Sequence, residues 1–376
     1  MCIVVIKQTK SFVLLTIYLS GGNRILQHSI RNNMHLNNKI LEPDDLEKAV
    51  KKANDKFGRL SSAQKEQVVQ QVLGLINQDM LLSRGQDEPF SRIVTHFRLI
   101  NPYLMQVEKY NEVNRISEYI LNAESNVWDV VEVAAFSAFF SNNYELAEGY
   151  FSKLIHNYPE HLEYRTILGK ILIELCRYDE AKIEMEKLLR TNAVSAQVLE
   201  VLVAACNALC DYDNAIKYGN MYLKYNKNNP QIYAEIYSAE YNGPYMDALT
   251  KRKKSSPQQL LIDSLMGDWE NEKIFTDLPK KEIEHMLQLG RKYEKKFSRW
   301  KNNDAAFSSY YWIILHIFSL VYFDYYKITK NVTYIKKAED NIKKAFCILN
   351  RHPELVREKQ ISQNLQNKIS DFTTKL

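Results

Sequence analysis

The sequence predicts an all-α protein built around a repeated pair of helices. Tyr110, Tyr144, Tyr178 and Tyr212 follow one another at one constant interval. The 376-residue chain has only 11 glycines and 9 prolines, which favours long helices with short connections over strands joined by turns. Hydrophobic residues make up 45% of the chain and charged residues 25%, the balance of a globular protein rather than a disordered one.

The tyrosines divide the middle of the chain into four units: 94–127, 128–161, 162–195 and 196–229. A small or apolar residue lies three places after each tyrosine, and a bulky residue lies ten places after it. A small residue lets two helices approach closely, and bulky residues nearby fill the remaining space, as in a stacked helical hairpin. These positions hold Val113, Ala147, Ala181 and Ala215, and then Ile120, Leu154, Leu188 and Tyr222.

This pattern resembles the tetratricopeptide repeat, a helical hairpin of about 34 residues. The motif residues of the two middle units are Tyr144, Ala147, Phe151, Leu154 and Pro159, and Leu168, Gly169, Tyr178, Ala181 and Leu188. The outer units depart from the motif, because Asn101 and Val203 stand where a small residue is expected. Pro102 predicts that the first helix of unit 94–127 starts late or kinks. The resemblance implies a hairpin solenoid over about 94–229.

Helices are also predicted before the repeats. Residues 34–93 form a predicted N-terminal cap, because 44–57 and 61–80 carry apolar residues at helical spacing. Residues 1–33 leave three alternatives open. In the first, the start is assigned too early and Met34 is the true start; in the second, the segment is a signal or membrane anchor; in the third, it is a structural element. The expected location is therefore cytoplasmic, with export or anchoring through residues 1–22 as the alternative.

After residue 229 the pattern slips by one place, to Tyr245 and Ala248. This predicts a partial fifth unit and an array over 94–249, followed by an exposed linker over 250–259 that contains a basic run. Residues 250–376 are the predicted C-terminal helical domain. Its segment 310–323 is almost entirely apolar but shorter than the roughly 20 residues that cross a bilayer, so a buried central helix is expected.

A helical hairpin is expected in the C-terminal domain as well. Ala338, Ile342 and Ala345 repeat the spacing of the second helix of the units. His316, inside the apolar segment, is expected to be a hydrogen-bonded core residue.

The sequence contains no motif that indicates catalysis, a cofactor or a metal site. Gly-rich phosphate loops, nucleophile elbows, zincin helices and CxxC pairs are absent from it. Cys206 and Cys210 lie four residues apart, which two metal ligands could use, but core packing is the expected role. The net charge of +5 is mild for a nucleic-acid-binding protein. We therefore expect no enzyme, no cofactor and no small-molecule substrate.

The resemblance implies that the first helix of each unit lines a concave groove. The groove is expected to be acidic, with a phenylalanine cluster that either packs against the neighbouring unit or stays open as an anchor. The basic and amide residues that would grip an acidic peptide tail are missing. The expected partner is therefore a protein segment with apolar anchors and some positive charge. The predicted groove residues are Glu132, Phe136, Phe139, Phe140, Lys170, Glu174, Glu200 and Asn207.

The resemblance implies a protein–protein interaction scaffold, adaptor or chaperone. The alternative is a regulatory protein whose repeats sense a signal while a flank in 34–93 binds nucleic acid, which requires a helix-turn-helix there. A third hypothesis, an enzyme built on the C-terminal domain, requires polar side chains that converge on the helix at 310–326. The sequence does not identify the partner, the pathway or the oligomeric state.

Overall fold

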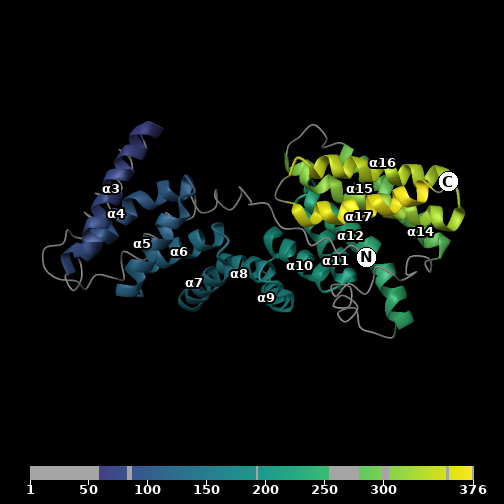
Figure 1. Ribbon diagram of the computed structural model, residues 1–376. Helices are drawn as coiled ribbons and strands as arrows, with labels where there is room; N and C mark the ends of the chain where they lie inside the picture. Colours follow the sequence, from purple (N-terminus) through teal and green to yellow (C-terminus); the bar gives the residue numbers. More distant parts are fainter. Residues whose placement is uncertain are drawn as a thin grey trace. The chain divides into compact units, whose positions relative to one another are not determined.

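The computed structural model confirms the predicted fold class. Its described part consists of helices and turns, and most helices follow the previous one after a short connection (Figure 1). The chain divides into two compact units between Leu175 and Cys176. The predicted domain limits stay a prediction. The described residues are 59–82, 87–191, 194–253, 279–298, 305–352 and 355–374.

The described residues of the first compact unit form six helices. Each helix packs against the next one along the chain, beginning with α3 against α4. Their bounds are α3 Ser62–Leu82, α4 Asp87–Gln106, α5 Tyr110–Ala123, α6 Trp128–Phe140, α7 Tyr144–Asn157 and α8 Leu162–Glu174.

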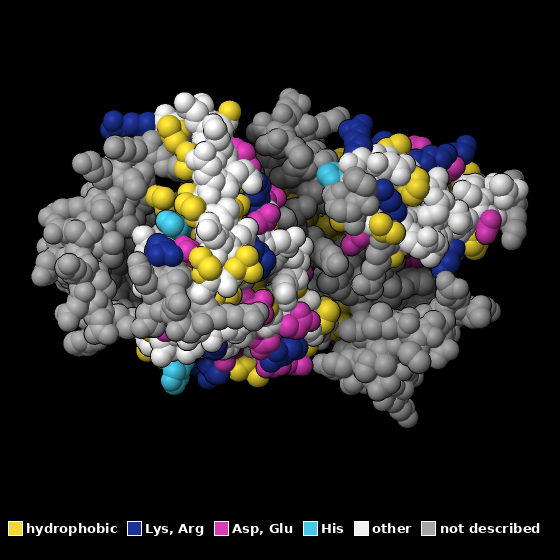
Figure 2. Space-filling model, turned by 60° about the vertical axis from the view of Figure 1, so that its left-hand side comes forward, with side chains coloured by type: hydrophobic (Ala, Val, Ile, Leu, Met, Phe, Trp, Pro, Cys, Tyr) yellow, Lys and Arg dark blue, Asp and Glu magenta, His cyan; other side chains and the backbone are white. Residues whose placement is uncertain are grey.

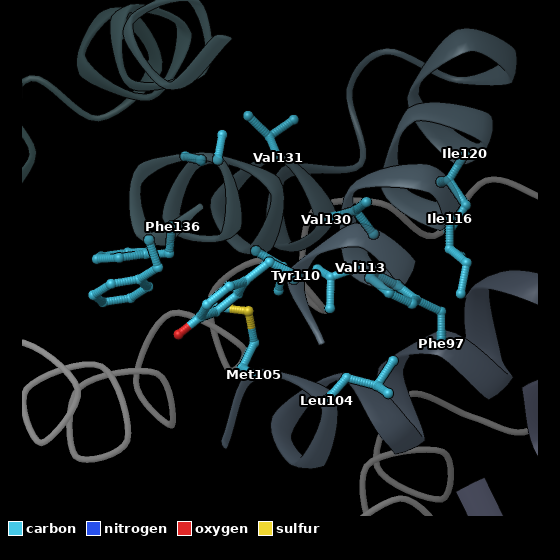
Figure 3. Close-up of a cluster of buried hydrophobic side chains, with 14 of the residues drawn as sticks. Phe97, Leu104, Met105, Tyr110, Val113, Ile116, Ile120, Val130, Val131 and Phe136 are labelled. Carbon is cyan, nitrogen blue, oxygen red and sulfur yellow. The ribbon is translucent and has the colours of Figure 1, made fainter. Parts of the chain in front are cut away.

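The core of this unit forms where α4, α5 and α6 meet. Phe97 and Leu104 come from α4, Val113 and Ile116 from α5, and Val130 from α6 (Figure 3). Each of these side chains is at most 1% exposed. Val113 is the residue three places after the tyrosine of unit 94–127, and its predicted inward position is confirmed.

The second compact unit continues the repeat and then adds a larger helical bundle. Its helices are α9 Tyr178–Arg190, α10 Ala196–Ala208, α11 Tyr212–Tyr225, α12 Pro230–Lys253, α14 Lys280–Ser298, α15 Ala305–Thr329, α16 Val332–Leu349 and α17 Val356–Thr373. The repeated tyrosine is the first residue of α5, α7, α9 and α11. Each interval between successive tyrosines therefore covers two helices and the connections that follow them.

A left-handed turn ends the first helix of each repeat. Glu108, Asn142, Cys176 and Cys210 have φ between 58° and 61° and follow one another at the same interval as the tyrosines. After α6, the Asn143 N–H donates to the Ala138 carbonyl at 2.9 Å, and the equivalent bonds after α4 and α10 measure 2.9 Å and 2.8 Å. These are the bonds of a Schellman motif, which satisfies the last carbonyls of a helix. The tyrosine follows two residues later and begins the second helix.

The structure confirms core packing for Cys206 and corrects it for Cys210. Cys206 is fully buried in α10, and burial raises the pKa of its thiol to about 12. Cys176 is exposed and Cys210 is half-buried, because both occupy the left-handed turn rather than an inward helix position. Cys206 and Cys210 therefore do not share a helix face.

Two helices continue through a proline. Of the two effects predicted for Pro102, a late start and a kink, the late start is wrong, because α4 begins at Asp87 and continues through the proline. The second helix expected near Tyr245 does not form, because α12 continues through Pro244 to Lys253. The fifth unit is therefore a single long helix, and its end includes the start of the expected basic linker. Each proline removes one backbone bond without ending its helix.

The N-terminal part of the described chain is anchored by polar contacts. Ser61 begins α3 with a capping box, in which its backbone N–H donates to the Gln64 side chain at 3.0 Å and Ser61 Oγ accepts from the Gln64 N–H. Lys109 Nζ lies 2.6 Å from Glu66 Oε1, which ties α3 to the turn before α5. The expected helix at 44–57 and the alternatives for residues 1–33 lie outside the described residues.

The apolar helix of the C-terminal domain is α15, and it packs against α12, α14, α16 and α17. Ala338, Ile342 and Ala345 of α16 are fully buried, as the spacing predicted. His316 is also fully buried, and its Nδ1 lies 3.1 Å from Ser362 Oγ of α17. Burial lowers the pKa of this imidazole to about 4. Among the described helices, none combines the length and the apolar character that crossing a membrane requires.

Gly290 makes the packing of α14 possible. An added Cβ would lie 2.5 Å from Tyr237 Oη and 2.6 Å from Phe318 Cδ2. Both neighbours are buried, so neither ring can move away without a change in the core.

We therefore expect Gly290→Ala to lower the free energy of unfolding by about 1–3 kcal/mol, through overpacking. Gly149→Ala is the matched control, because Gly149 is an exposed residue of α7 with nothing near its Cβ position. That substitution should stabilise the helix by up to about 1 kcal/mol. Denaturant unfolding of both variants measures the difference, and equal shifts would show that the close contact at Gly290 does not constrain the fold.

Candidate functional site

The eight predicted groove residues all lie on first helices of the repeats. Glu132, Phe136, Phe139 and Phe140 are on α6, Lys170 and Glu174 on α8, and Glu200 and Asn207 on α10. The structure places those of α6 and α8 in the first compact unit and those of α10 in the second.

Two of the three phenylalanines are buried. Phe136 and Phe140 are each 7% exposed, whereas Phe139 is half-buried. The Phe136 ring meets Phe151 of α7 edge-on at 5.4 Å, and Phe140 stacks on Tyr110 of α5 at 5.9 Å. These two rings therefore fill contacts between neighbouring helices. The half-buried side chains at this face of α6 are Trp128, Glu132 and Phe139.

Glu132 is the polar centre of this face. Its Oε1 accepts a hydrogen bond of 2.9 Å from the hydroxyl of Tyr164 in α8. Burial raises the pKa of the Glu132 carboxyl to about 7, and the nearby negative charges of Asp129 and Glu163 act in the same direction. No ion pair of Glu132 is formed within the described residues.

The neighbouring acid, Asp129, is neutralised by the protein itself. Arg98 of α4 donates from Nε to Asp129 Oδ2 at 2.6 Å and from Nη2 to Oδ1 at 2.9 Å. This two-bond geometry is the strong form of an arginine–carboxylate pair. The same turn of α6 thus presents one carboxylate that is paired with a guanidinium and one that is not.

A chain of aromatic contacts leads from Trp128 to Tyr164, whose hydroxyl binds Glu132. Trp128 meets Tyr158 edge-on at 5.9 Å, and Tyr158 meets His161 edge-on at 5.8 Å. His161 lies 5.5 Å from the buried ring of Tyr164. Burial raises the pKa of Tyr158, and the charges of Glu132 and Asp129 raise it further. We call Trp128, Glu132, Tyr158, His161 and Tyr164 the Glu132 surface.

Most of the Glu132 surface was not predicted from the sequence. Tyr158 follows the last residue of α7 and His161 precedes the first residue of α8, so neither lies at a first-helix position of the repeat. Trp128 could have been found, because it lies four residues before Glu132 and therefore on the same side of the helix.

The other predicted residues differ in exposure. Lys170 is 6% exposed, and Glu174, Glu200 and Asn207 are half-buried. On the face drawn in Figure 2, hydrophobic side chains are interspersed with acidic and basic ones. Among the described residues, no group of three or more His, Cys, Asp and Glu side chains could hold a metal ion.

The polar residues of α15 bind to different neighbours. His316 contacts Ser362, Ser319 Oγ donates to the Ala338 carbonyl at 2.7 Å, and Asp324 pairs with Lys327 at 3.1 Å. His316 and Ser319 join α15 to α17 and α16, whereas Asp324 and Lys327 form an ion pair within α15. The convergence that the enzyme hypothesis requires is not seen among these three side chains.

The raised pKa of Glu132 predicts how stability changes with pH. The folded chain binds the proton more tightly than the unfolded chain, so this group stabilises the fold below pH 4.5 and loses that contribution as pH rises through about 7. We expect Glu132→Gln to reduce the loss of unfolding free energy between pH 5 and pH 8, by on the order of 1–3 kcal/mol. Denaturant unfolding at both pH values tests this. The exposed residue Glu145 of α7 supplies the control, Glu145→Gln, and the same pH response in all three proteins would mean that Glu132 titrates normally.

No family model and no curated protein matches this chain. Among solved structures, a tetratricopeptide repeat protein from Parabacteroides merdae is similar, with 11% identity, a TM-score of 0.48, and coverage of 86% of this chain and 99% of that one. A structure described as "MamA MSR-1 C2" has 22% identity, a TM-score of 0.36, and coverage of 46% and 98%. The structure of Naa15/Naa10 bound to HypK-THB has 13% identity, a TM-score of 0.33, and coverage of 96% and 59%. At these identities the likeness concerns the fold alone.

Proposed function

We propose that this protein is a non-catalytic scaffold that holds a segment of a partner protein on the first helices of its repeats. The observation that carries the proposal is the Glu132 surface, where a carboxylate without an ion pair among the described residues accepts a hydrogen bond from buried Tyr164, at the end of a chain of half-buried aromatic rings. Repeat folds bind many kinds of partner, so the chemistry of this surface has to identify the partner.

The surface favours a segment with a basic side chain beside an apolar one. A cation near Glu132 would satisfy the carboxylate, and the faces of Trp128 and Tyr158 attract cations as well. Phe139, on the same side of α6, offers contact for an apolar neighbour. Arg98 already pairs with Asp129 one turn away, which shows that this turn of α6 accommodates a guanidinium. An adaptor or a chaperone would use such a surface in the same way.

Selection of peptides from a random library on the full chain tests the proposal. We expect the recovered peptides to contain Lys or Arg next to an apolar residue. Their affinity should fall about tenfold or more with Glu132→Gln, because a hydrogen bond to a charged group contributes about 1.5–3 kcal/mol. Trp128→Ala should weaken them as well, whereas Glu145→Gln, on the exposed start of α7, should not. Peptides without basic residues, or peptides that bind Glu132→Gln equally well, would rule the proposal out.

Binding of a basic peptide should also depend on pH. The cation prefers the ionised carboxylate, and the pKa of Glu132 is raised to about 7. Affinity should therefore rise about tenfold between pH 6 and pH 8, as the ionised fraction increases, and should fall with added salt. Titration calorimetry at both pH values measures this change, and a constant affinity would assign the binding to another surface.

A further inference from the structure

The second compact unit contains a row of buried polar side chains on α12. Gln231, Glu235, Ser238 and Asn242 are between 4% and 8% exposed. They are spaced by four, three and four residues and therefore share one side of the helix. A row of buried polar residues is costly unless each finds a partner, so the partners of these four side chains are informative.

Glu235 and Asn207 satisfy each other only in part. Asn207 of α10 donates from Nδ2 to Glu235 Oε2 at 2.7 Å. Because a carboxylate only accepts hydrogen bonds, the Asn207 atom that faces Glu235 must be Nδ2. Asn207 Oδ1 therefore points away from this carboxylate oxygen. Asn207 Oδ1 is buried and has no hydrogen bond within the described chain. Glu235 Oε1 also accepts none there.

The charge of Glu235 is not balanced by a neighbouring cation among the described residues. Burial raises the pKa of this carboxyl to about 7, the charge of Glu200 on α10 acts in the same direction, and the Asn207 bond opposes both. The site therefore contains a carboxylate oxygen and an amide oxygen that both lack a donor.

Asn242 extends the same side of α12. One end of its amide binds Ser238 Oγ at 3.1 Å, and its Oδ1 has no partner in the part of the chain that the structure describes. Asn242 follows Glu235 by two turns of helix, which separates them by about 10 Å. Three residues of extended chain span about the same length.

We propose that Glu235 and Asn207 bind the guanidinium group of an arginine side chain in a partner segment, and that Asn242 binds the backbone of that segment about three residues away. A guanidinium carries only donors, in a fixed plane, and so matches a carboxylate oxygen beside an amide oxygen. It is also less strongly hydrated than an ammonium group, which suits a buried acceptor. The partner segment is that of the proposed function, on which this assignment rests.

Free arginine derivatives test the site separately from the partner. The probe is N-acetyl-arginine methylamide, and N-acetyl-citrulline methylamide is its neutral counterpart of nearly the same shape. Binding to the full chain carrying Glu132→Gln, which removes the carboxylate of the Glu132 surface, is measured by saturation-transfer NMR. We expect arginine to bind at least about tenfold more tightly than citrulline.

Variants of α12 and α10 assign this binding. Adding Glu235→Gln, which keeps the shape of the protonated acid, should weaken arginine at least about tenfold, and Asn207→Ala should weaken it as well. Glu240→Gln is the matched control, since Glu240 is a half-buried acid of α12 whose neighbours are Tyr293 and Lys292 of α14. Circular dichroism shows whether each variant is folded. If Glu235→Gln does not fold, the effect of Asn207→Ala on arginine binding tests the assignment by itself.

Three outcomes would overturn the assignment. Equal binding of arginine and citrulline would show that the site does not recognise the charge. Arginine binding that survives both Glu235→Gln and Asn207→Ala would place it elsewhere. If arginine binds the unmodified chain but is lost with Glu132→Gln alone, the proposed function survives and this inference fails. If the α12 site binds arginine but no basic peptide is selected on the full chain, the inference survives and the proposed function fails.

Discussion

The left-handed turn that ends the first helix of each repeat is the constraint on which the rest of the array depends. Its backbone bonds recur where α4, α6 and α10 end, and its left-handed residue recurs at the interval of the tyrosines. The turn fixes the residue at which the next helix begins. Small and bulky residues at set distances from that start then face the same contacts in every repeat, so a fixed turn geometry produces a periodic core.

The carboxylates on the first helices of the repeats differ in how their charge is balanced. Asp129 is held by Arg98 from the preceding repeat, and its charge is used inside the fold. Glu132 and Glu235 have only a tyrosine hydroxyl and an amide as hydrogen-bond partners among the described residues. Burial opposes the charged form of both carboxyls, and each pKa is raised to about 7. A bound cation would favour the charged form, which couples partner binding to proton release.

Sequence reasoning located the helix that carries the Glu132 surface better than it located the residues of the surface. It chose Phe136 and Phe140 on helical spacing, and both are buried against α7 and α5. Spacing identifies the side of a helix but not what covers that side. Tyr158 and His161 come from the connection between two helices, and their approach to Trp128 depends on how α7 and α8 are packed.

The sequence by itself determined the helical class, the constant interval of the repeats and the inward positions such as Val113, because these depend on local turn geometry and on the spacing of small and bulky residues. It did not determine where α4 begins or where α12 ends. Both helices continue through a proline, because tertiary packing of the whole helix outweighs the loss of one backbone bond. Only the tertiary structure decided that Arg98 neutralises Asp129 and that no ion pair forms at Glu132 or Glu235 within the described residues. Pairing between side chains far apart in the sequence follows from how helices pack, which no local pattern encodes.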